Sequence, residues 1–259
     1  MSSSASEQSS NGNRPVFSGH PGEEFSIQGH CAFLILPRDV RAGPAQPWVW
    51  YAPTLLPSLP GPEENWMFAK FLAAGLAIAG IDVGESFGSP DGRKLFTALH
   101  RHLVNERGFA KQPALLARSR GGLMLYNWAV EHPESVACIA GIYPVCNLVS
   151  YPGLAKACGA YGLTEAGLAA RLTEHNPLER VAALAAARVP ILHLHGDHDE
   201  IVPLAENSAA LAERYARHGG ELRLIVAEGR GHDRWAGWFE SPELVEFVIA
   251  HATRRQSAS

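Results

Sequence analysis

One stretch decides the fold of this chain: Gln112-Pro-Ala-Leu-Leu-Ala-Arg-Ser119-Arg-Gly-Gly-Leu-Met-Leu-Tyr-Asn-Trp-Ala129. Its apolar run from Ala114 to Ala117 is typical of a buried parallel strand, and Gly121 to Glu131 has the periodicity of a helix. A strand that turns into a helix within about three residues leaves the turning side chain at the carboxyl edge of the sheet, facing the free N–H groups of the helix. We therefore predict that Ser119 lies on such a turn.

The turn departs slightly from the usual nucleophile elbow. That motif is Gly-x-Ser-x-Gly, whose small residues let strand and helix come into contact. Here the segment is Ala117-Arg-Ser119-Arg-Gly121, and alanine is still small. The motif predicts that Ser119 is a nucleophile. The alternative is that Ser119 only caps the helix, which is a common role for serine.

Length and composition restrict the class of protein. The chain has 259 residues, which suits one α/β domain with a sizeable core. A formal net charge of −4 without a long basic run gives no support for nucleic acid as a partner. The longest apolar stretch, Phe71 to Ile81, is too short and too rich in glycine to span a bilayer, so we expect no membrane partner. Four scattered cysteines indicate neither a zinc knuckle nor a disulfide scaffold.

The N-terminal segment differs from the rest of the chain. Residues 1 to about 20 contain too little apolar surface to offset the entropy of ordering, so we predict disorder there. Met1 to Asn13 has no apolar core of a signal peptide, which favours a cytoplasmic protein, or a secreted one if a leader was removed. One domain is expected over residues 21–254, followed by a tail at 255–259.

Strand and helix patterns alternate along this domain. Expected strands cover residues 25–28, 31–37, 48–52, 76–83, 114–117, 137–143, 190–195 and 221–226. Expected helices cover residues 63–74, 91–107, 121–131, 204–217 and 241–253. Residues 145–188 interrupt the alternation, and we expect a short lid that covers the pocket and sets substrate choice. The pattern specifies an α/β fold with a mostly parallel central sheet and helices on both faces.

Two further loops carry polar groups at the same expected edge of the sheet. Gly196-Asp-His-Asp199-Glu-Ile-Val-Pro203 follows one strand, and Gly229-Arg-Gly-His232 follows the last strand. A serine hydroxyl becomes a nucleophile when a histidine takes its proton, and a buried carboxylate fixes the tautomer of that histidine. Ser119, His232 and an aspartate of the first loop therefore form a candidate triad.

On these motifs the chain resembles a compact α/β-hydrolase, closest to single-domain serine esterases and to the catalytic domains of prolyl-oligopeptidase-like enzymes. The resemblance covers about residues 24–252 and includes the chain order Ser, Asp, His. It implies that Asp199 is the acid, because the acid of the family lies three residues before a Val-Pro pair. Asp197 is then expected to shape the turn. The resemblance implies no cofactor and no metal.

An oxyanion hole needs two N–H donors that face the developing negative charge. The backbone of Arg120 is the first candidate. The second is expected from the loop after the 48–52 strand, where a proline comes first and cannot donate, which leaves Thr54 or Leu55. Tyr51 is a further candidate that offers its phenol, as in some oligopeptidase relatives; the alternative is that it only packs in the core.

Four other residues are candidates for substrate binding. Arg118 and Arg120 flank the serine and suit an anionic group such as a carboxylate. The alternative is that they pair with acids and brace the turn. Acids available for this are Asp82, Glu85 and Asp91. Trp235 and Trp238 offer a stacking surface for a sugar or an aromatic group, or else packing for the last helix.

A metal site is the competing hypothesis. The segment His193-Leu-His195-Gly-Asp197-His198 fits the pattern His-x-His-x-Asp-His, the zinc signature of metallo-β-lactamase-fold hydrolases. Against a zinc-dependent hydrolase, His193 and His195 alternate with leucines inside a predicted buried strand. We favour the serine triad.

The sequence as a whole predicts a serine hydrolase that cleaves a carboxylic ester or a related acyl bond of a small molecule through an acyl-enzyme on Ser119. Alternatives within the same triad are a peptidase or deacylase and a lactonase, and a non-catalytic binding protein on the same scaffold is another. The expected partner is a small-molecule ester, with an anionic or carbohydrate-linked group among the options. Nothing in the sequence indicates the oligomeric state.

Overall fold

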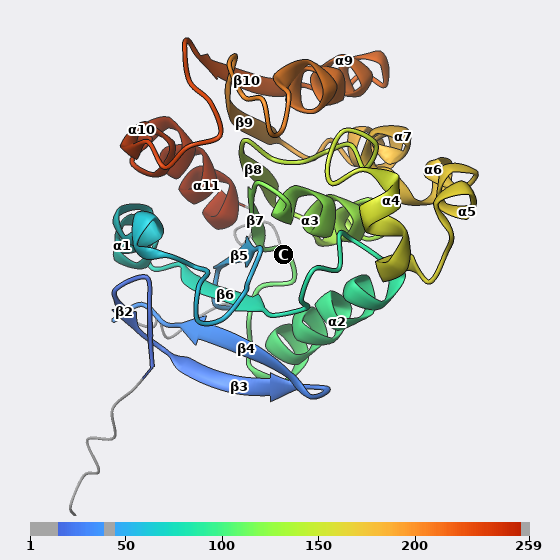
Figure 1. Ribbon diagram of the computed structural model, residues 1–259. Coiled ribbons are helices and arrows are strands. Elements are labelled where there is room, and N and C mark those ends of the chain that lie inside the picture. The colour runs from blue at the N-terminus through green and yellow to red at the C-terminus, as the bar shows by residue number, and fades with distance from the viewer. Residues whose placement is uncertain (1–14, 39–44, 255–259) are drawn as a thin grey trace, which may run out of the picture.

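A computed structural model describes residues 15–38 and 45–254 of the chain (Figure 1). Its main sheet has eight strands: β3 (Glu23–Ile27), β4 (His30–Ile35), β5 (Trp48–Ala52), β6 (Ala77–Ile81), β7 (Ala114–Arg118), β8 (Cys138–Ile142), β9 (Ile191–Gly196) and β10 (Leu222–Ala227). Their order across the sheet is β10-β9-β8-β7-β5-β6-β4-β3. β4 pairs antiparallel with both of its neighbours, β3 and β6. All other neighbouring strands in this order pair in parallel. The predicted mostly parallel α/β sheet is confirmed.

Helices cover both faces of this sheet, as Figure 1 shows. One layer is α1 (Asn65–Ala73) with α11 (Pro242–Arg254), and the other is α2 (Pro90–Arg101), α3 (Gly121–Ala129) and α9 (Ser208–Arg217). Because side chains alternate along a strand, β5 contributes to both layers. Trp48 and Trp50 pack in the core with α2, α3 and α9, and Val49 and Tyr51 pack in the core with α1 and α11.

The insertion at residues 145–188 forms five short α-helices and the 3-10 helix η4 (Cys158–Tyr161). The α-helices are α4 (Leu154–Ala157), α5 (Glu165–Ala169), α6 (Leu172–His175), α7 (Pro177–Arg180) and α8 (Ala182–Ala186). Leu148, Tyr161 and Leu168 of this segment share a separate apolar cluster with Leu123 of α3. The Tyr161 hydroxyl donates to the Phe87 carbonyl at 2.8 Å. The insertion therefore packs beside α3, as the yellow helices do in Figure 1.

The prediction of disorder at the N-terminus is wrong for residues 15–20, which the structure describes. Residues 1–14 of the expected disordered segment, and the tail at 255–259, lie outside the described residues. β1 (Val16–Phe17) and β2 (His20–Pro21) instead form a small antiparallel ribbon. Phe17 is buried and stacks on Phe33 of β4 with ring centroids 4.9 Å apart, so one aromatic contact fixes a segment with little other apolar surface.

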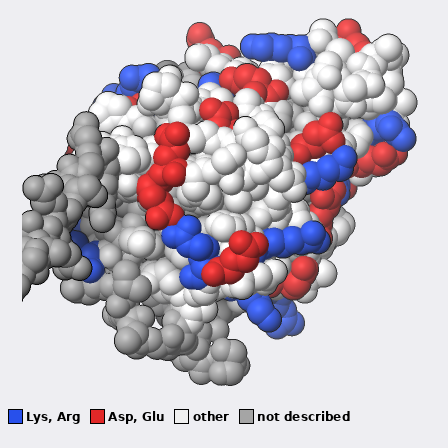
Figure 2. All heavy atoms as spheres, turned by 90° about the horizontal axis from the view of Figure 1, so that it is seen from below, with Lys and Arg blue, Asp and Glu red and all other residues white. Residues whose placement is uncertain are grey.

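Two observations concern partners. No helix within residues 15–38 and 45–254 is long and apolar enough to cross a bilayer. On the face seen in Figure 2, basic and acidic side chains lie intermixed, without a continuous basic patch. That view covers one face, and the prediction about nucleic acid stays a prediction.

Candidate active site

Ser119 lies on the turn between β7 and α3, in the left-handed region of backbone conformation. Its φ is +49°, a conformation that costs a residue with a Cβ about 1–2 kcal/mol. Three backbone bonds hold the turn. The Ser119 N–H donates to the Ile142 carbonyl at 3.0 Å, and the Ser119 carbonyl accepts from Gly122 at 2.9 Å and Val145 at 2.8 Å. The strand-to-helix turn is therefore present, with the serine at its apex.

Gly121 and Gly122, which follow Arg120, show why the motif needs small residues after the serine. A Cβ on Gly121 would lie 2.0 Å from the Ala52 carbonyl oxygen of β5. On Gly122 it would lie 2.3 Å from the Val145 carbonyl. On the other side of the serine, Ala117 is fully buried, so a methyl group is accommodated where the strict motif has glycine.

The structure brings Ser119, His232 and Asp199 together from three loops. They follow β7, β10 and β9, whose carboxyl ends meet at one edge of the sheet. Ser119 Oγ lies 2.9 Å from His232 Nε2, and His232 Nδ1 lies 2.8 Å from Asp199 Oδ2. These two distances are those of hydrogen bonds in a serine, histidine and carboxylate triad.

Asp199 is held as an ionised carboxylate. Its side chain is fully buried, and Oδ1 accepts the N–H groups of Ile201 at 3.0 Å and Val202 at 2.8 Å. Burial by itself raises the pKa of this carboxyl, but hydrogen bonds from His195, His232 and Val202 hold the pKa well below its ordinary value. The charge therefore keeps the proton of His232 on Nδ1 and leaves Nε2 free to accept from Ser119.

Asp197 has a different environment. Asp197 is exposed to solvent, and its Oδ1 accepts a hydrogen bond from the Gly229 N–H at 2.7 Å. This bond links the loop after β9 to the loop after β10. The structure thus places Asp197 where it shapes the turn and places Asp199 on His232.

A cavity of about 400 Å³ opens beside Ser119. Its walls come from the loop after β5 (Pro53, Leu55, Ser58 and Leu59), the serine with Arg118 and Arg120, Tyr143, and His232 to Arg234. No residue of the 145–188 insertion lines the cavity among the described residues, so the expectation of a lid over the pocket is wrong for this structure. The insertion packs against α3, and the loop after β5 forms the cavity wall instead.

Tyr143 is a pocket residue that the sequence analysis missed. Its ring centroid lies 4.2 Å from that of His232, and its hydroxyl donates to the Asp233 carbonyl at 3.2 Å. Burial raises the pKa of this phenol to about 12, so the hydroxyl remains a donor. Its position directly after β8, at the edge where the triad assembles, was the available signal.

Arg118 is buried in an ion cluster. Its Nη1 lies 2.5 Å from Glu64 Oε1 and its Nη2 lies 2.7 Å from Glu63 Oε1. Burial lowers the pKa of the guanidinium, but Tyr51 and the glutamates raise it above its ordinary value, so the charge is kept. Arg118 therefore pairs with acids, as one of the two alternatives predicted. Its partners are the glutamates of the η1 turn (Pro62–Glu64) and not the acids expected from the sequence.

Tyr51 is not a substrate or oxyanion residue in this structure. The side chain is 1% exposed, and its hydroxyl donates to Glu64 Oε1 at 2.8 Å. Burial raises the pKa of the phenol well above 10, which keeps it a donor to that carboxylate. The structure thus favours the alternative that Tyr51 packs in the core over the one in which its phenol faces the substrate, because the buried Glu64 needs this proton.

Arg120 lies at the rim of the cavity. Its Nε is 3.0 Å from Glu85 Oε1, one of the expected acids, and its side chain is 26% exposed. The Arg120 N–H precedes the first turn of α3, where N–H groups lack intrahelical acceptors.

The second oxyanion donor stays a prediction, and Thr54 forms an isolated parallel β-bridge with Asp82. The Leu55 N–H donates to the Leu59 carbonyl at 3.1 Å, so it is not a free donor. The prediction that Leu55 supplies the second oxyanion donor is therefore wrong for this structure. Leu55 instead contributes its side chain to the cavity wall. Thr54, which is 2% exposed, stays a prediction.

Both tryptophans lie off the cavity wall. Trp238 is 1% exposed and donates from Nε1 to Asp233 Oδ1 at 2.9 Å. Trp235 is 37% exposed, with the Arg230 guanidinium 4.3 Å from its ring centroid and the Trp238 ring packed edge-on. The contacts of Trp235 and Trp238 therefore favour the packing alternative over substrate stacking, and they lie around α10 (Ala236–Phe239).

The side chains of the predicted zinc motif lie in different environments. His193 and His195 are fully buried and their ring nitrogens contact Tyr126, Ser208 and the Val202 carbonyl. Asp197 and His198 are exposed on the loop beyond the strand. Within the described part of the chain, these side chains do not form a cluster that could hold a metal. The zinc hypothesis is thus contradicted by the geometry of its own ligands.

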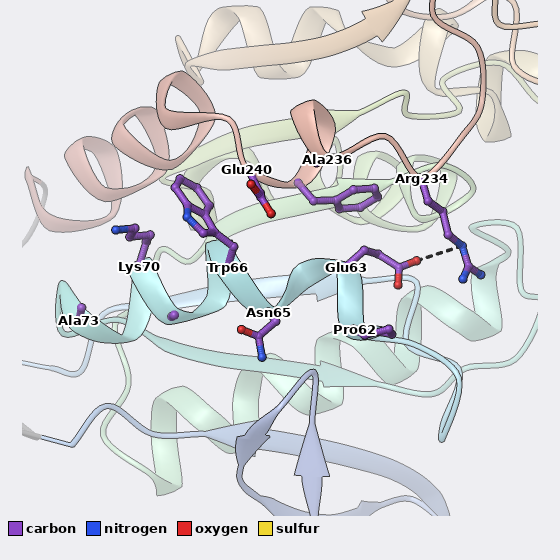
Figure 3. A pocket seen from close by; sticks show the side chains of 11 residues that line it. Pro62, Glu63, Asn65, Trp66, Lys70, Ala73, Arg234, Ala236 and Glu240 are labelled. Atoms are coloured by element: carbon purple, nitrogen blue, oxygen red, sulfur yellow. Dashed lines mark ion pairs between the residues drawn. The ribbon is translucent and has the colours of Figure 1, made fainter.

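A second hollow of about 620 Å³ adjoins the cavity (Figure 3). Arg234 lines both, and its Nε pairs with Glu63 Oε1 at 3.2 Å, drawn as the dashed line in Figure 3. Trp66 of α1 forms part of the wall, with Lys70 Nζ 5.3 Å from its ring centroid. The Arg234–Glu63 pair thus lies on the boundary between the two hollows.

Comparison with solved structures shows the fold at large evolutionary distance. A puromycin-hydrolyzing peptidase of Mycobacterium tuberculosis is 18% identical with a TM-score of 0.70, over 93% of this chain and 40% of that one. Dipeptidyl peptidase 4 of Porphyromonas gingivalis is 14% identical with a TM-score of 0.71, over 90% of this chain and 36% of that one. The chain therefore spans well under half the length of these peptidases.

An S-formylglutathione hydrolase of Agrobacterium tumefaciens is similar over nearly its whole length. It is 16% identical with a TM-score of 0.68, and the match covers 93% of this chain and 98% of that one. No curated protein sequence matches the chain. The model of the prolyl oligopeptidase family, peptidase family S9, matches residues 96–253, a range that includes Ser119, Asp199 and His232. The chain therefore belongs to the prolyl oligopeptidase family, a family of α/β-hydrolases.

Proposed function

We propose that this serine hydrolase cleaves a carboxylic ester, or a related acyl bond, of a small molecule through an acyl-enzyme on Ser119. One observation carries the proposal. The continuous bonds from Ser119 Oγ to His232 Nε2 at 2.9 Å and from His232 Nδ1 to Asp199 at 2.8 Å provide a base for the hydroxyl proton. The cavity of about 400 Å³ favours a small acyl group.

The reaction then follows from the proton positions. His232 Nε2 takes the Ser119 proton while Oγ attacks the acyl carbon, and the N–H of Arg120, with that of Thr54, receives the developing oxyanion. The protonated His232 gives its proton to the leaving alcohol, which departs and leaves the acyl group on Oγ. A water molecule deprotonated by His232 hydrolyses this ester, and Oγ regains its proton. Asp199 stabilises the imidazolium in both halves.

Amide cleavage is the second candidate, because the family model and two of the similar structures are peptidases. The same groups serve, with the proton from His232 going to a leaving amine. Parallel assays with p-nitrophenyl esters and matched p-nitroanilides of the same acyl groups separate the two. An ester preference supports the first proposal, and faster anilide turnover overturns it in favour of a peptidase.

The first test is labelling with a fluorophosphonate probe, measured by intact mass. We expect one adduct on the wild type and none on Ser119→Ala. Ser58→Ala is the matched control, since Ser58 also lines the cavity but has no contact with His232. Absence of an adduct on folded wild-type protein would contradict an activated serine and would favour a binding protein on this scaffold.

A further inference from the structure

Four buried side chains form a continuous chain of hydrogen bonds behind the triad acid. The Tyr126 hydroxyl lies 2.7 Å from His193 Nε2, and His193 Nδ1 lies 2.9 Å from Ser208 Oγ. The same Ser208 Oγ lies 2.7 Å from His195 Nδ1. All four residues are 0% exposed, and they come from α3, β9 and α9. A buried polar network of this kind is costly unless every member is satisfied.

The last member of the chain reaches the loop that carries the acid. His195 Nε2 lies 2.8 Å from the Val202 carbonyl and 3.4 Å from Asp199 Oδ2. Val202 also supplies one of the two backbone N–H groups on Asp199 Oδ1. His195 therefore contacts both the carboxylate and the backbone that orients it.

The number of available hydrogens determines which groups donate and which accept along this network. A carbonyl only accepts, so His195 Nε2 carries a hydrogen. With that single hydrogen on the ring, Nδ1 accepts from the Ser208 hydroxyl. Ser208 has a single proton, so His193 must donate to it from Nδ1. His193 Nε2 is then bare and accepts from Tyr126.

Two observations support this assignment. Burial lowers the pKa of His193 to about 3, which keeps that ring neutral. A Cβ on Gly141 of β8 would lie 2.6 Å from His193 Cδ2, so the sheet has no room for a side chain beside this imidazole.

We infer that His195 is a positioning residue of the triad, oriented by Ser208, His193 and Tyr126, whose Nε2–H fixes the Asp199 carboxylate and the Val202 backbone. The inference rests on the proposed role of Ser119 as nucleophile. Two neighbouring histidines of one strand consequently carry opposite tautomers, with the hydrogen on Nε2 in His195 and on Nδ1 in His193.

A matched pair of substitutions tests the role of the Nε2–H. His195→Gln places an amide nitrogen near the position of Nε2 and keeps the donor, whereas His195→Asn reaches only the position of Nδ1 and keeps the contact with Ser208. We expect His195→Asn to lose about tenfold or more in kcat with KM little changed, and His195→Gln to stay within about threefold of wild type. Tyr215→Phe is the control: this buried hydroxyl lies outside the network and donates to the Leu184 and Val189 carbonyls, so its loss should retain kcat.

Thermal unfolding of the same three variants separates positioning from stability. Each variant loses a buried hydrogen bond, so all three should unfold at lower temperature than wild type. If kcat follows the melting temperature across the three variants, or if the Gln and Asn variants lose kcat equally, the positioning role is wrong.

The tautomers give a readout that does not need activity. Nitrogen-15 NMR of the histidine rings in the wild-type protein should show one Nε2–H ring and one Nδ1–H ring for these two residues, identified by their loss in His195→Gln and in His193→Gln. Identical tautomers would overturn the network. If the tautomers are opposite but the fluorophosphonate probe does not label Ser119, the network stands and the proposed function fails.

Discussion

Two loops at the same edge of the sheet support the site in different ways. The loop after β9 carries Asp199, which takes its backbone hydrogen bonds from residues two and three positions further along the chain. The loop after β5 carries Glu64, whose guanidinium partner, Arg118, is 54 positions away. The acid of the first loop is oriented by its own backbone, whereas the acid of the second loop is held by the strand that ends at the serine.

The two loops therefore have different effects on the molecule. The loop after β9 fixes the charge that orients His232, so changes there should act on the reaction rate. The end of the loop after β5 holds Glu64, which pairs with the buried charge of Arg118 next to the nucleophile, so changes at Glu64 should act on folding stability. Four predictions test this contrast, and each has a matched control.

The largest effect is expected at Asp199. Asp199→Asn should lower kcat by about 10⁴-fold, because a neutral amide no longer fixes the Nδ1–H tautomer of His232. Asp197→Asn, two positions away, should stay within about threefold, because the Asp197 carboxylate accepts from the Gly229 N–H and is not the carboxylate bonded to His232. Ester hydrolysis by the two variants measures the difference. A loss confined to Asp197→Asn would show that the acid is assigned to the wrong residue.

The second effect is on stability and concerns Glu64. Glu64→Ala removes a fully buried carboxylate that accepts from Arg118 and Tyr51, and breaking such a pair costs about 3–5 kcal/mol. Glu85→Ala is the control, since Glu85 pairs with Arg120 at the half-exposed rim and such pairs contribute about 1 kcal/mol or less. Urea unfolding measures both free energies. Equal losses would contradict the division between the two loops.

The third effect is the dependence of stability on pH. Because the pKa of Asp199 is depressed in the folded protein, its contribution is present above its unfolded pKa of about 3.9 and is lost as pH falls through the folded value. The unfolding free energy of wild type should therefore fall more steeply than that of Asp199→Asn as pH decreases below about 4. Unfolding curves at several acidic pH values measure the two slopes, and parallel slopes would argue against a depressed pKa.

The smallest effect is expected at Arg120, between the two loops. Its guanidinium lines the cavity, so Arg120→Ala should lower kcat/KM for a carboxylate-bearing ester by about fivefold, or roughly 1 kcal/mol, and leave a matched neutral ester unchanged. Equal losses on both esters would remove Arg120 as an anion-recognition residue and leave only its backbone N–H in the proposal.

The contrast also explains which parts of the structure could be predicted from sequence. The strand Trp48–Ala52 and the turn at Ser119 match their predictions, because periodicity and small residues determine them locally. The aspartate before Val202 and the histidine after β10 also follow from local motifs. The fold and the grouping of the triad are therefore visible in short segments of the chain.

The remaining features depend on contacts between distant segments. The sequence leaves the Tyr51 hydroxyl open between an oxyanion donor and a packed side chain, because nothing near it in sequence shows that Glu64 is buried against Arg118. Leu55 was assigned as a donor because its bond to Leu59 closes a turn with no recognisable pattern. The insertion was expected over the pocket because its apolar residues do not indicate which surface they pack on.

The wall of the cavity has a consequence for protein engineering. The backbones of Leu55 and Leu59 bond to each other in both directions, at 3.1 and 2.8 Å, so this short turn is closed by its own main chain. Its side chains face the cavity but make no part of the triad. A library randomised at Leu55, Ser58 and Leu59 should therefore change the range of accepted acyl groups while the nucleophile, base and acid keep their geometry, which makes this turn the place to begin directed evolution of the enzyme.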